Sequence, residues 1–229
     1  MSETLPEIKA IILDMDGTLI DTESLYKMSW QQAAQNLGFD ISDEDYQQFV
    51  GIPFTICLER VKALLPAKTN SETFFKQLVC VQDQLKRALG FPMQPGAHEL
   101  LTLLQNHSIA TALVTSSGKK NIAEYFTGTT FANMFDITVA FEDVTQHKPN
   151  PAPYILACQQ LNLAPEQTLV IEDSNNGATA AIQAGCHTVI VPGISPLSNE
   201  VKARAWGIYS NLHQILTQII EPVLTNSNH

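Results

Sequence analysis

The stretch Ile11–Thr18 reads IILDMDGT and decides how this chain folds. Three apolar residues run directly into two carboxylates, Asp14 and Asp16, and a Gly-Thr pair follows. The apolar run predicts a buried strand that ends where the first carboxylate begins. Because carboxylates are costly to desolvate unless a cation or hydrogen-bond donors pair with them, we expect such partners nearby. Ligands bind at the carboxyl ends of strands in open parallel sheets, so this strand end is a candidate site.

The residues that follow this strand show a helical pattern. Between residues 20 and 92, apolar side chains recur at helical spacing in four segments, and Gly38 and Pro66 interrupt the pattern. Ser42 and Ser71 are candidate caps of the second and fourth helices. We therefore predict a small all-helical domain over residues 20–92, inserted after the first strand.

The rest of the chain alternates between helices and strands. Strands are predicted near residues 109–115, 137–140, 168–171, 187–191 and 208, with helices between them. This alternation implies βαβ units and a parallel sheet covered on both faces. The predicted fold is therefore α/β: residues 1–19 and 93–229 form a Rossmann-like parallel sheet with helices on both faces, and the helical domain is an insert.

Composition and charge narrow the class of protein. The formal net charge of −10 disfavours nucleic-acid binding, which relies on basic patches. No apolar run approaches the roughly 18 residues that a membrane span needs, and the acidic N-terminus does not resemble a signal peptide. We expect a monomeric cytoplasmic protein without nucleic-acid or membrane partners. The scattered cysteines fit free thiols rather than a zinc site: Cys57, Cys80, Cys158 and Cys186.

Polar residues also stand at the ends of two later strands and in the chain segment between those strands. Because the carboxyl ends of parallel strands share one edge, we expect these residues to gather beside Asp14 and Asp16. Several carboxylates without a histidine or cysteine cluster favour a hard cation such as Mg²⁺. With a lysine and hydroxyl donors, such a set suits phosphoryl transfer through a carboxylate nucleophile, with a second carboxylate as acid and base. The residues concerned are Thr115, Ser116, Lys148, Glu172 and Asp173.

Four motifs in this order resemble the haloacid dehalogenase superfamily, in particular its helical-cap members that are similar to β-phosphoglucomutase. The resemblance covers essentially the whole chain and implies a Mg²⁺-dependent enzyme whose helical insert is a cap over the substrate. The motifs are residues 14–18 (DMDGT), Thr115-Ser116, Lys148-Pro149 and Glu172-Asp173-Ser174.

The resemblance also implies roles for single residues. Asp14 is the expected nucleophile and Asp16 the expected acid and base. Thr115 and Lys148 would hold the phosphoryl group and the nucleophile. The expected Mg²⁺ ligands are Asp14, the backbone carbonyl of Asp16, and Asp173, with Glu172 as a further ligand or as a carboxylate behind the ligands.

Substrate contacts are expected from Thr115, Ser116 and Lys148, and from Gly51 and Tyr26 of the cap. For Tyr26, packing inside the helical domain is the alternative. His147 stands before Lys148-Pro149, where glycine is more usual in the family, so this loop is expected to be stiffer or to contact the substrate.

These residues favour a Mg²⁺-dependent phosphatase that acts on a small phosphorylated metabolite of the sugar phosphate type. A β-phosphoglucomutase-like phosphomutase is the alternative. Two departures disfavour it: residues 51–54 (GIPF) carry no charge after the cap glycine, and Tyr26 stands where some mutases have histidine. A non-catalytic phospho-ligand-binding protein is the more distant alternative, although all four motifs keep their acids.

Overall fold

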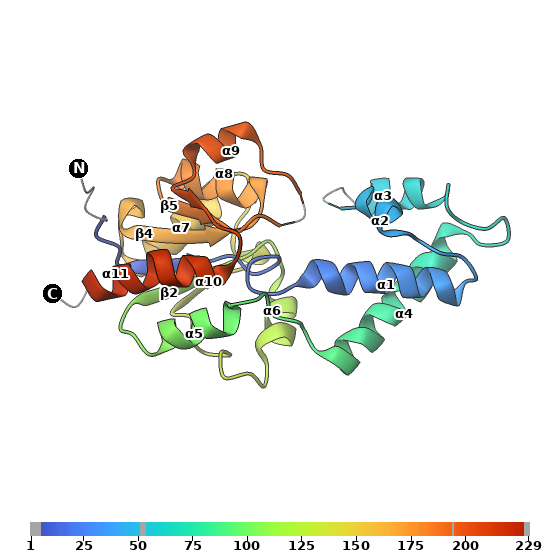
Figure 1. The fold of residues 1–229 in the computed structure, drawn as a ribbon, viewed down its shortest axis with the longest axis horizontal. Helices are drawn as coiled ribbons and strands as arrows, with labels where there is room; N and C mark the ends of the chain where they lie inside the picture. Colours follow the sequence, from blue (N-terminus) through green and yellow to red (C-terminus); the bar gives the residue numbers. More distant parts are fainter. Residues whose placement is uncertain (1–5, 51–53, 194, 227–229) are drawn as a thin grey trace. The chain divides into compact units, whose positions relative to one another are not determined.

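The computed structural model describes residues 6–50, 54–193 and 195–226. The chain divides into two compact units, residues 1–20 with 93–229 and residues 21–92. Figure 1 shows the strands in the first unit, while the second consists of helices. Ile20 belongs to the sheet unit, where it forms an isolated antiparallel bridge with Met93.

The first unit is built on one parallel sheet with the strand order β3-β2-β1-β4-β5-β6. The predicted α/β fold is thus confirmed. Strand β1 lies between β2 and β4, and all four of its residues are completely buried, which explains its uninterrupted apolar sequence. The strands are β1 (Ala10–Leu13), β2 (Ala110–Val114), β3 (Ile137–Val139), β4 (Thr168–Glu172), β5 (His187–Ile190) and β6 (Gly207–Ile208).

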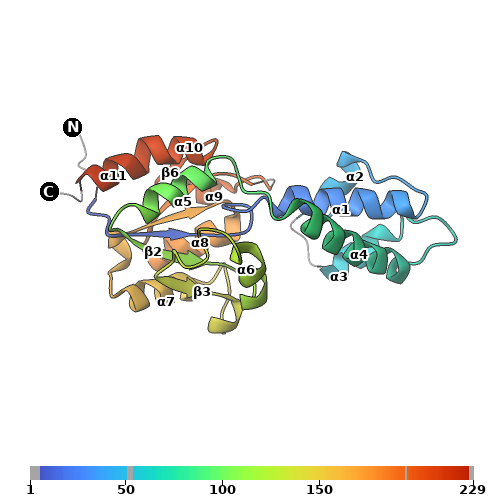
Figure 2. The ribbon, with the colours of Figure 1, turned by 90° about the horizontal axis from the view of Figure 1, so that it is seen from below.

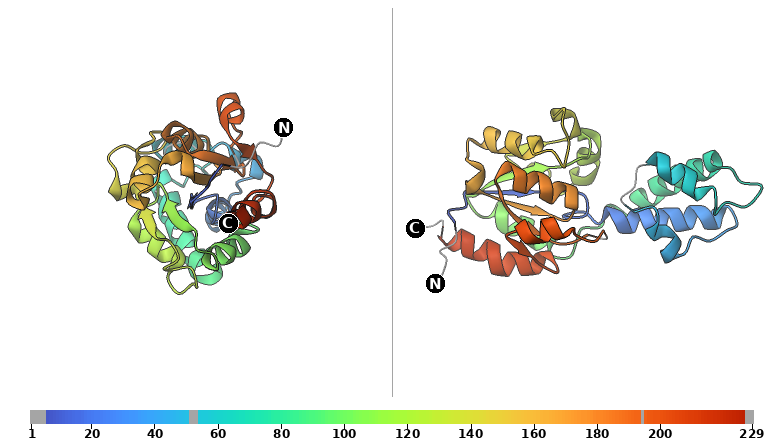
Figure 3. Two further views of the ribbon diagram at one scale, coloured as in Figure 1. Left: turned by 90° about the vertical axis from the view of Figure 1, so that its left-hand side faces the viewer. Right: turned by 90° about the horizontal axis from the view of Figure 1, so that it is seen from above.

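Helices cover both faces of this sheet. Figures 2 and 3 show α7 and α8 on one face, and α5 with the C-terminal helices on the other. The α7–α8 face is sealed by buried side chains that include Tyr154, Cys158 and Ala181. The helices of this unit are α5 (Ala97–Gln105), α6 (Lys119–Phe126), α7 (Ala152–Leu161), α8 (Asn175–Ala184), α9 (Asn199–Arg204), α10 (Leu212–Ile215) and α11 (Glu221–Asn226).

Three short helical turns complete the sheet unit. They are the 3₁₀ turns η1 (Phe141–Asp143) and η2 (Pro165–Gln167) and the π-helical turn η3 (Leu216–Ile220). Because η3 joins α10 to α11, the last helical stretch runs from Leu212 to Asn226. No described helix is long and apolar enough to cross a membrane.

The second unit packs around an aromatic core. The Trp30 ring stacks on Phe49 with centroids 4.4 Å apart and meets Phe74 edge-on at 5.3 Å. Such packing stabilises a small domain beyond simple area burial. Its helices are α1 (Thr22–Asn36), α2 (Asp43–Gln47), α3 (Phe54–Val61) and α4 (Ser71–Leu89).

Of the two helix caps predicted in this unit, the cap of α2 is confirmed and the cap of α4 is formed by a different residue. Ser42 caps α2 in a capping box with Asp45. The prediction that Ser71 caps α4 is wrong: the side chain of Asn70 accepts the N–H of Thr73, so Ser71 is the first helical residue.

Candidate active site

The expected site residues from the sheet unit lie at the carboxyl edge of its central strands. Asp14 directly follows β1, Thr115 follows β2, and Glu172 ends β4. Because β2 and β4 flank β1, these three positions are neighbours. The N–H of Asp14 still donates to the carbonyl of Ile171, at 3.0 Å, so the strand pairing fixes where its side chain starts.

Lys148 connects two carboxylates at this edge. Its ammonium lies 2.7 Å from Oδ1 of Asp14 and 2.7 Å from Oε1 of Glu172, and donates to the carbonyl of Val114 at 3.0 Å. The lysine side chain is only 5% exposed. Burial would lower the pKa of Lys148, but the charges of Asp14 and Glu172 outweigh it and raise that pKa. The lysine therefore stays an ammonium beside Asp14.

Glu172 is surrounded by hydrogen-bond donors from the protein itself. Oε1 accepts from Lys148 and, at 2.8 Å, from the hydroxyl of Tyr154. Oε2 accepts from the N–H of Asp173 and from both the N–H and the hydroxyl of Ser174, all within 3.1 Å. Burial favours the protonated acid, yet these donors and Lys148 lower the pKa of Glu172, so it stays a carboxylate. Its five donors fit a carboxylate that orients Lys148.

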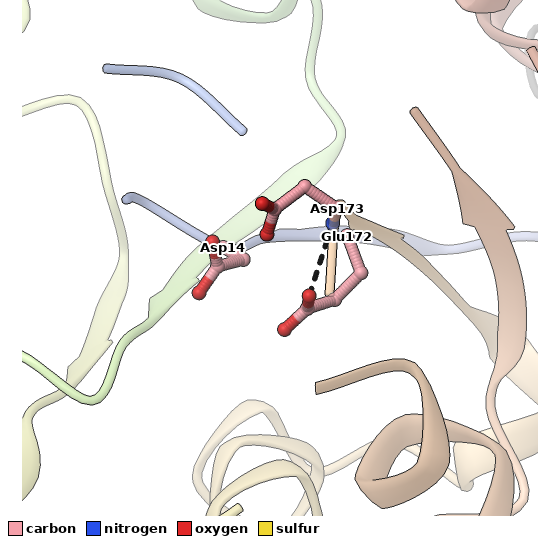
Figure 4. A group of neighbouring side chains, drawn as sticks. All are labelled: Asp14, Glu172 and Asp173. Carbon is pink, nitrogen blue, oxygen red and sulfur yellow. Dashed lines mark hydrogen bonds between the residues drawn. The ribbon is translucent and has the colours of Figure 1, made fainter. Parts of the chain in front are cut away.

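Three carboxylates here have the spacing of a metal site. Asp14, Glu172 and Asp173 each offer an oxygen, and these oxygens lie within 4.8 Å of one another (Figure 4). Oδ2 of Asp14 is buried and, within the described structure, accepts no hydrogen bond. An orphaned buried carboxylate oxygen next to a second acid fits a bound cation, and the all-oxygen donor set fits Mg²⁺.

The pKa values of this acidic cluster also indicate a shortage of positive charge. Burial, reinforced by the charges of Glu172 and Asp16, raises the pKa of Asp14 to about 7 in spite of Lys148. Burial and the charges of Asp14 and Glu172 raise the pKa of Asp173 to about 9. A single lysine does not balance these acids, and a divalent cation would restore their ionised forms.

The Asp173 side chain has room only because two residues next to its carboxylate are glycines. A Cβ on Gly17 or on Gly193 would collide with its carboxylate. Gly17 also has φ of +89°, a left-handed conformation that side chains rarely adopt. The glycine of the DMDGT stretch thus makes the turn and gives room to the carboxylate.

Asp16 has a different environment from Asp14, because hydroxyl groups surround it. Its Oδ2 accepts from Ser117 Oγ at 2.7 Å and from Thr115 Oγ1 at 3.3 Å, and the Tyr125 side chain also bonds to the carboxylate. Burial raises the pKa of Asp16, while these three hydrogen bonds lower it in part. A carboxyl group with a raised pKa next to exchangeable hydroxyls is suited to carry a proton.

The remaining expected residues lie elsewhere or outside the described chain. Ser116 is exposed in the turn after β2, and it is Ser117 that bonds to Asp16. Tyr26 packs against the aromatic core of the helical unit, in line with the packing alternative. Gly51 lies outside the described residues.

Sequence reasoning missed Tyr154, Ser117 and Tyr125. Tyr154 stands in the first turn of α7, only six residues after Lys148. This closeness to Lys148 was the one signal that could have placed Tyr154 at the site. Ser117 lies in the same strand-end cluster as Thr115, but the pattern did not show which serine turns inward. Tyr125 had no signal, since its spacing on α6 is that of a core residue.

This geometry agrees with comparisons to known proteins. The sequence profile described as haloacid dehalogenase-like hydrolase matches residues 11–191. This chain belongs to that family. The family resemblance expected from the motifs is thereby confirmed. The candidate active site of this hydrolase lies at the carboxyl ends of β1, β2 and β4, all within the matched residues.

Individual relatives of this hydrolase have different names. A phosphorylated carbohydrates phosphatase of Thermotoga maritima is 31% identical over 198 residues, 86% of this chain and 89% of that protein. The pyrophosphatase PpaX of Oceanobacillus iheyensis is 27% identical over 184 residues, 80% and 83% of the two chains. A crystal structure of a candidate β-phosphoglucomutase from Thermotoga maritima superposes with a TM-score of 0.80 at 28% identity, covering 93% and 99%.

Proposed function

We propose that this hydrolase is a Mg²⁺-dependent phosphatase that acts on a small phosphorylated metabolite, a sugar phosphate, through an aspartyl-phosphate. The observation that carries this proposal is the contrast between two carboxylates two residues apart. Asp14 lies against the ammonium of Lys148, and Asp16 lies against the hydroxyls of Ser117 and Thr115. With Lys148 and a bound cation beside it, Asp14 is placed to be ionised and attack, and Asp16 is placed to carry a proton.

In the first step a carboxylate oxygen of Asp14 attacks phosphorus. The bond between phosphorus and the alcohol oxygen breaks, and Asp16 donates its proton to that oxygen as it leaves. Lys148, 2.7 Å from Asp14, neutralises negative charge on the nucleophile and on the phosphoryl oxygens. Thr115 follows the neighbouring strand and can donate to the same phosphoryl group.

In the second step Asp16, now ionised, takes a proton from water. That water attacks the phosphorus of the aspartyl-phosphate, the bond to the Asp14 oxygen breaks, and inorganic phosphate leaves. Microscopic reversibility lets one carboxyl group serve as acid first and base second. The hydrogen bond from Ser117 keeps Asp16 in place for both steps, which leaves the single hydroxyl proton of Thr115 for the phosphoryl group.

Mg²⁺ would be held by Asp14, Asp173 and the backbone carbonyl of Asp16, with Glu172 orienting Lys148 from behind. When bound, it would neutralise charge that develops on the phosphoryl oxygens. The helical unit is the proposed cap. Free thiols at Cys57, Cys80, Cys158 and Cys186 fit a cytoplasmic location.

A phosphomutase is the second candidate, because the candidate β-phosphoglucomutase superposes with this fold. A phosphomutase of this kind must also bind a second phosphate group. Residues 51–54 (GIPF) carry no charged side chain for this purpose after the cap glycine, which favours release of phosphate over transfer back to a sugar.

A phosphatase panel with Mg²⁺ tests the proposal. It should contain sugar phosphates, pyrophosphate, phosphoglycolate and acetyl phosphate, with kcat/KM for each active substrate. We expect phosphate release that stops after chelation and is highest for sugar phosphates. Incubation of β-glucose 1-phosphate with a trace of the bisphosphate separates the candidates: glucose 6-phosphate as the main product would establish the mutase. Ligand binding without turnover would identify a non-catalytic binding protein.

A further inference from the structure

An aromatic pair stands beside the catalytic lysine and has no role in the steps above. The rings of Phe141 and His147 are stacked in parallel, with centroids 3.9 Å apart and planes inclined by 6°. Phe141 is nevertheless 47% exposed. A large aromatic side chain that is held flat and left half exposed at an enzyme site is typical of a surface that receives a ligand.

Both rings are fixed to residues of the site. His147 directly precedes Lys148, whose ammonium contacts Asp14. The N–H of Phe141 donates to the carbonyl of Ser117 at 3.0 Å, and the hydroxyl of Ser117 donates to Asp16. The pair is therefore anchored on one side to the lysine beside the nucleophile and on the other to the residue that holds the acid and base.

The turn that carries Phe141 is itself held in place and is acidic. Asp143 accepts the N–H of Ala140 and pairs with Lys119, while Glu142 accepts the N–H of Lys119. A ring on such a turn keeps its orientation. Glu142, the residue after Phe141 in the chain, is exposed and adds negative charge to this turn, which disfavours a leaving group that carries its own negative charge.

We propose that the Phe141–His147 pair selects the leaving alcohol: it receives the apolar C–H face of a cyclic, uncharged skeleton, such as a sugar ring. This proposal rests on the proposed phosphatase function and narrows its substrate class. Small acyclic or anionic leaving groups, such as acetate, glycolate or phosphate, would gain nothing from the pair. The contact acts on binding, so its loss should appear mainly in KM.

The test compares one cyclic and one acyclic substrate in Phe141→Ala. For the full-length Phe141→Ala variant we expect kcat/KM on glucose 6-phosphate to fall about tenfold, mainly through KM, because an apolar contact of this size discriminates by about 10- to 200-fold. On acetyl phosphate, kcat/KM should stay within about twofold of the wild type, because its leaving group, acetate, gains nothing from the pair. His147→Gly, which removes the support behind Phe141, should show the same selectivity in weaker form.

A second histidine–aromatic pair provides the matched control. His187 and Trp206, with centroids 5.1 Å apart, lie where β5 and β6 begin, at the opposite edge of the sheet, and Trp206 is 36% exposed. Trp206→Ala should leave both substrates unaffected. Equal losses of Phe141→Ala on both substrates, or none on either, would overturn the proposal while the phosphatase stands. A wild type that hydrolyses only acyclic substrates would do the same, and one inactive on the whole panel would refute the phosphatase and this proposal with it.

Discussion

Tyr154 and Glu172 form a completely buried hydrogen bond, 2.8 Å from the phenol oxygen to Oε1, and this same carboxylate oxygen accepts from Lys148. The Lys148 ammonium also lies 5.0 Å from the centroid of the Tyr154 ring. Burial and the charge of Glu172 raise the pKa of Tyr154, so the phenol keeps the proton that it donates. Tyr154 thus positions Lys148 against Asp14 through Glu172, without touching the reacting atoms.

The substitution Tyr154→Phe removes this one donor and keeps the ring. We expect kcat to fall about tenfold, because partners behind site residues are typically worth about 10- to 100-fold in activity. KM should change little, since the phenol does not touch substrate. The free energy of unfolding should fall by about 1–3 kcal/mol, because Glu172 loses a donor to a buried charge. Steady-state kinetics and urea denaturation measure the two effects.

Thr168→Val is the matched control for Tyr154→Phe. Thr168 is buried at the start of β4, four residues before Glu172, and its hydroxyl donates to the carbonyl of Pro165 at 2.7 Å. Loss of this hydroxyl should lower stability by about 1 kcal/mol and leave kcat unchanged. If both variants lowered kcat to the same extent, the role of Tyr154 would be merely structural.

Substitution of Asp14, the proposed nucleophile, gives a second prediction. Asp14→Asn keeps the shape of the side chain, and Lys148 keeps Glu172 and the carbonyl of Val114 as partners, so the fold should persist. Turnover should fall by at least about a thousandfold, as for the loss of other nucleophiles. Asp136→Asn, at the residue just before β3, is the control and should retain activity. Near-normal phosphate release by pure Asp14→Asn protein would falsify the aspartyl-phosphate mechanism.

Gly177→Ala tests the space around Glu172. Helix propensity alone predicts that alanine inside α8 stabilises the protein by about 1 kcal/mol. A Cβ on Gly177 would, however, collide with the Glu172 carboxylate, whose five hydrogen bonds leave it no room to move. We therefore expect a net loss of about 1–3 kcal/mol in the free energy of unfolding, with lower kcat. A higher melting temperature would show that Glu172 is free to shift.

The sequence alone predicted the sheet and the acids at its edge, because these depend on strong and local signals. The apolar run before Asp14 predicts a fully buried strand, and parallel topology brings later strand ends to the same edge. Ser117 and Tyr154 could not be chosen this way, since which hydroxyl reaches Asp16 or Glu172 depends on turn geometry and packing. The cap of α4 was missed because Asn70 and Ser71 are both good capping residues.

The acidic cluster also makes stability depend on pH. In the folded protein the pKa of Asp14 is about 7 and that of Asp173 about 9, against an ordinary value of 3.8 for both. Between these values the folded state binds more protons than the unfolded state, so the free energy of unfolding falls as pH rises. The contribution of these acids is complete below about pH 4 and is lost through pH 7 and pH 9.

Mg²⁺ should weaken this trend, because it binds the ionised carboxylates that burial disfavours. With a chelator present, the melting temperature should fall between pH 5 and pH 9, a window set by the pKa values of about 7 and about 9. With Mg²⁺ the fall should be smaller, and the difference between the two curves should widen with pH. In Asp173→Asn the difference should shrink, because one ligand and one titrating acid are both lost. A Mg²⁺ effect of equal size in Asp173→Asn and in wild type would place the ion elsewhere.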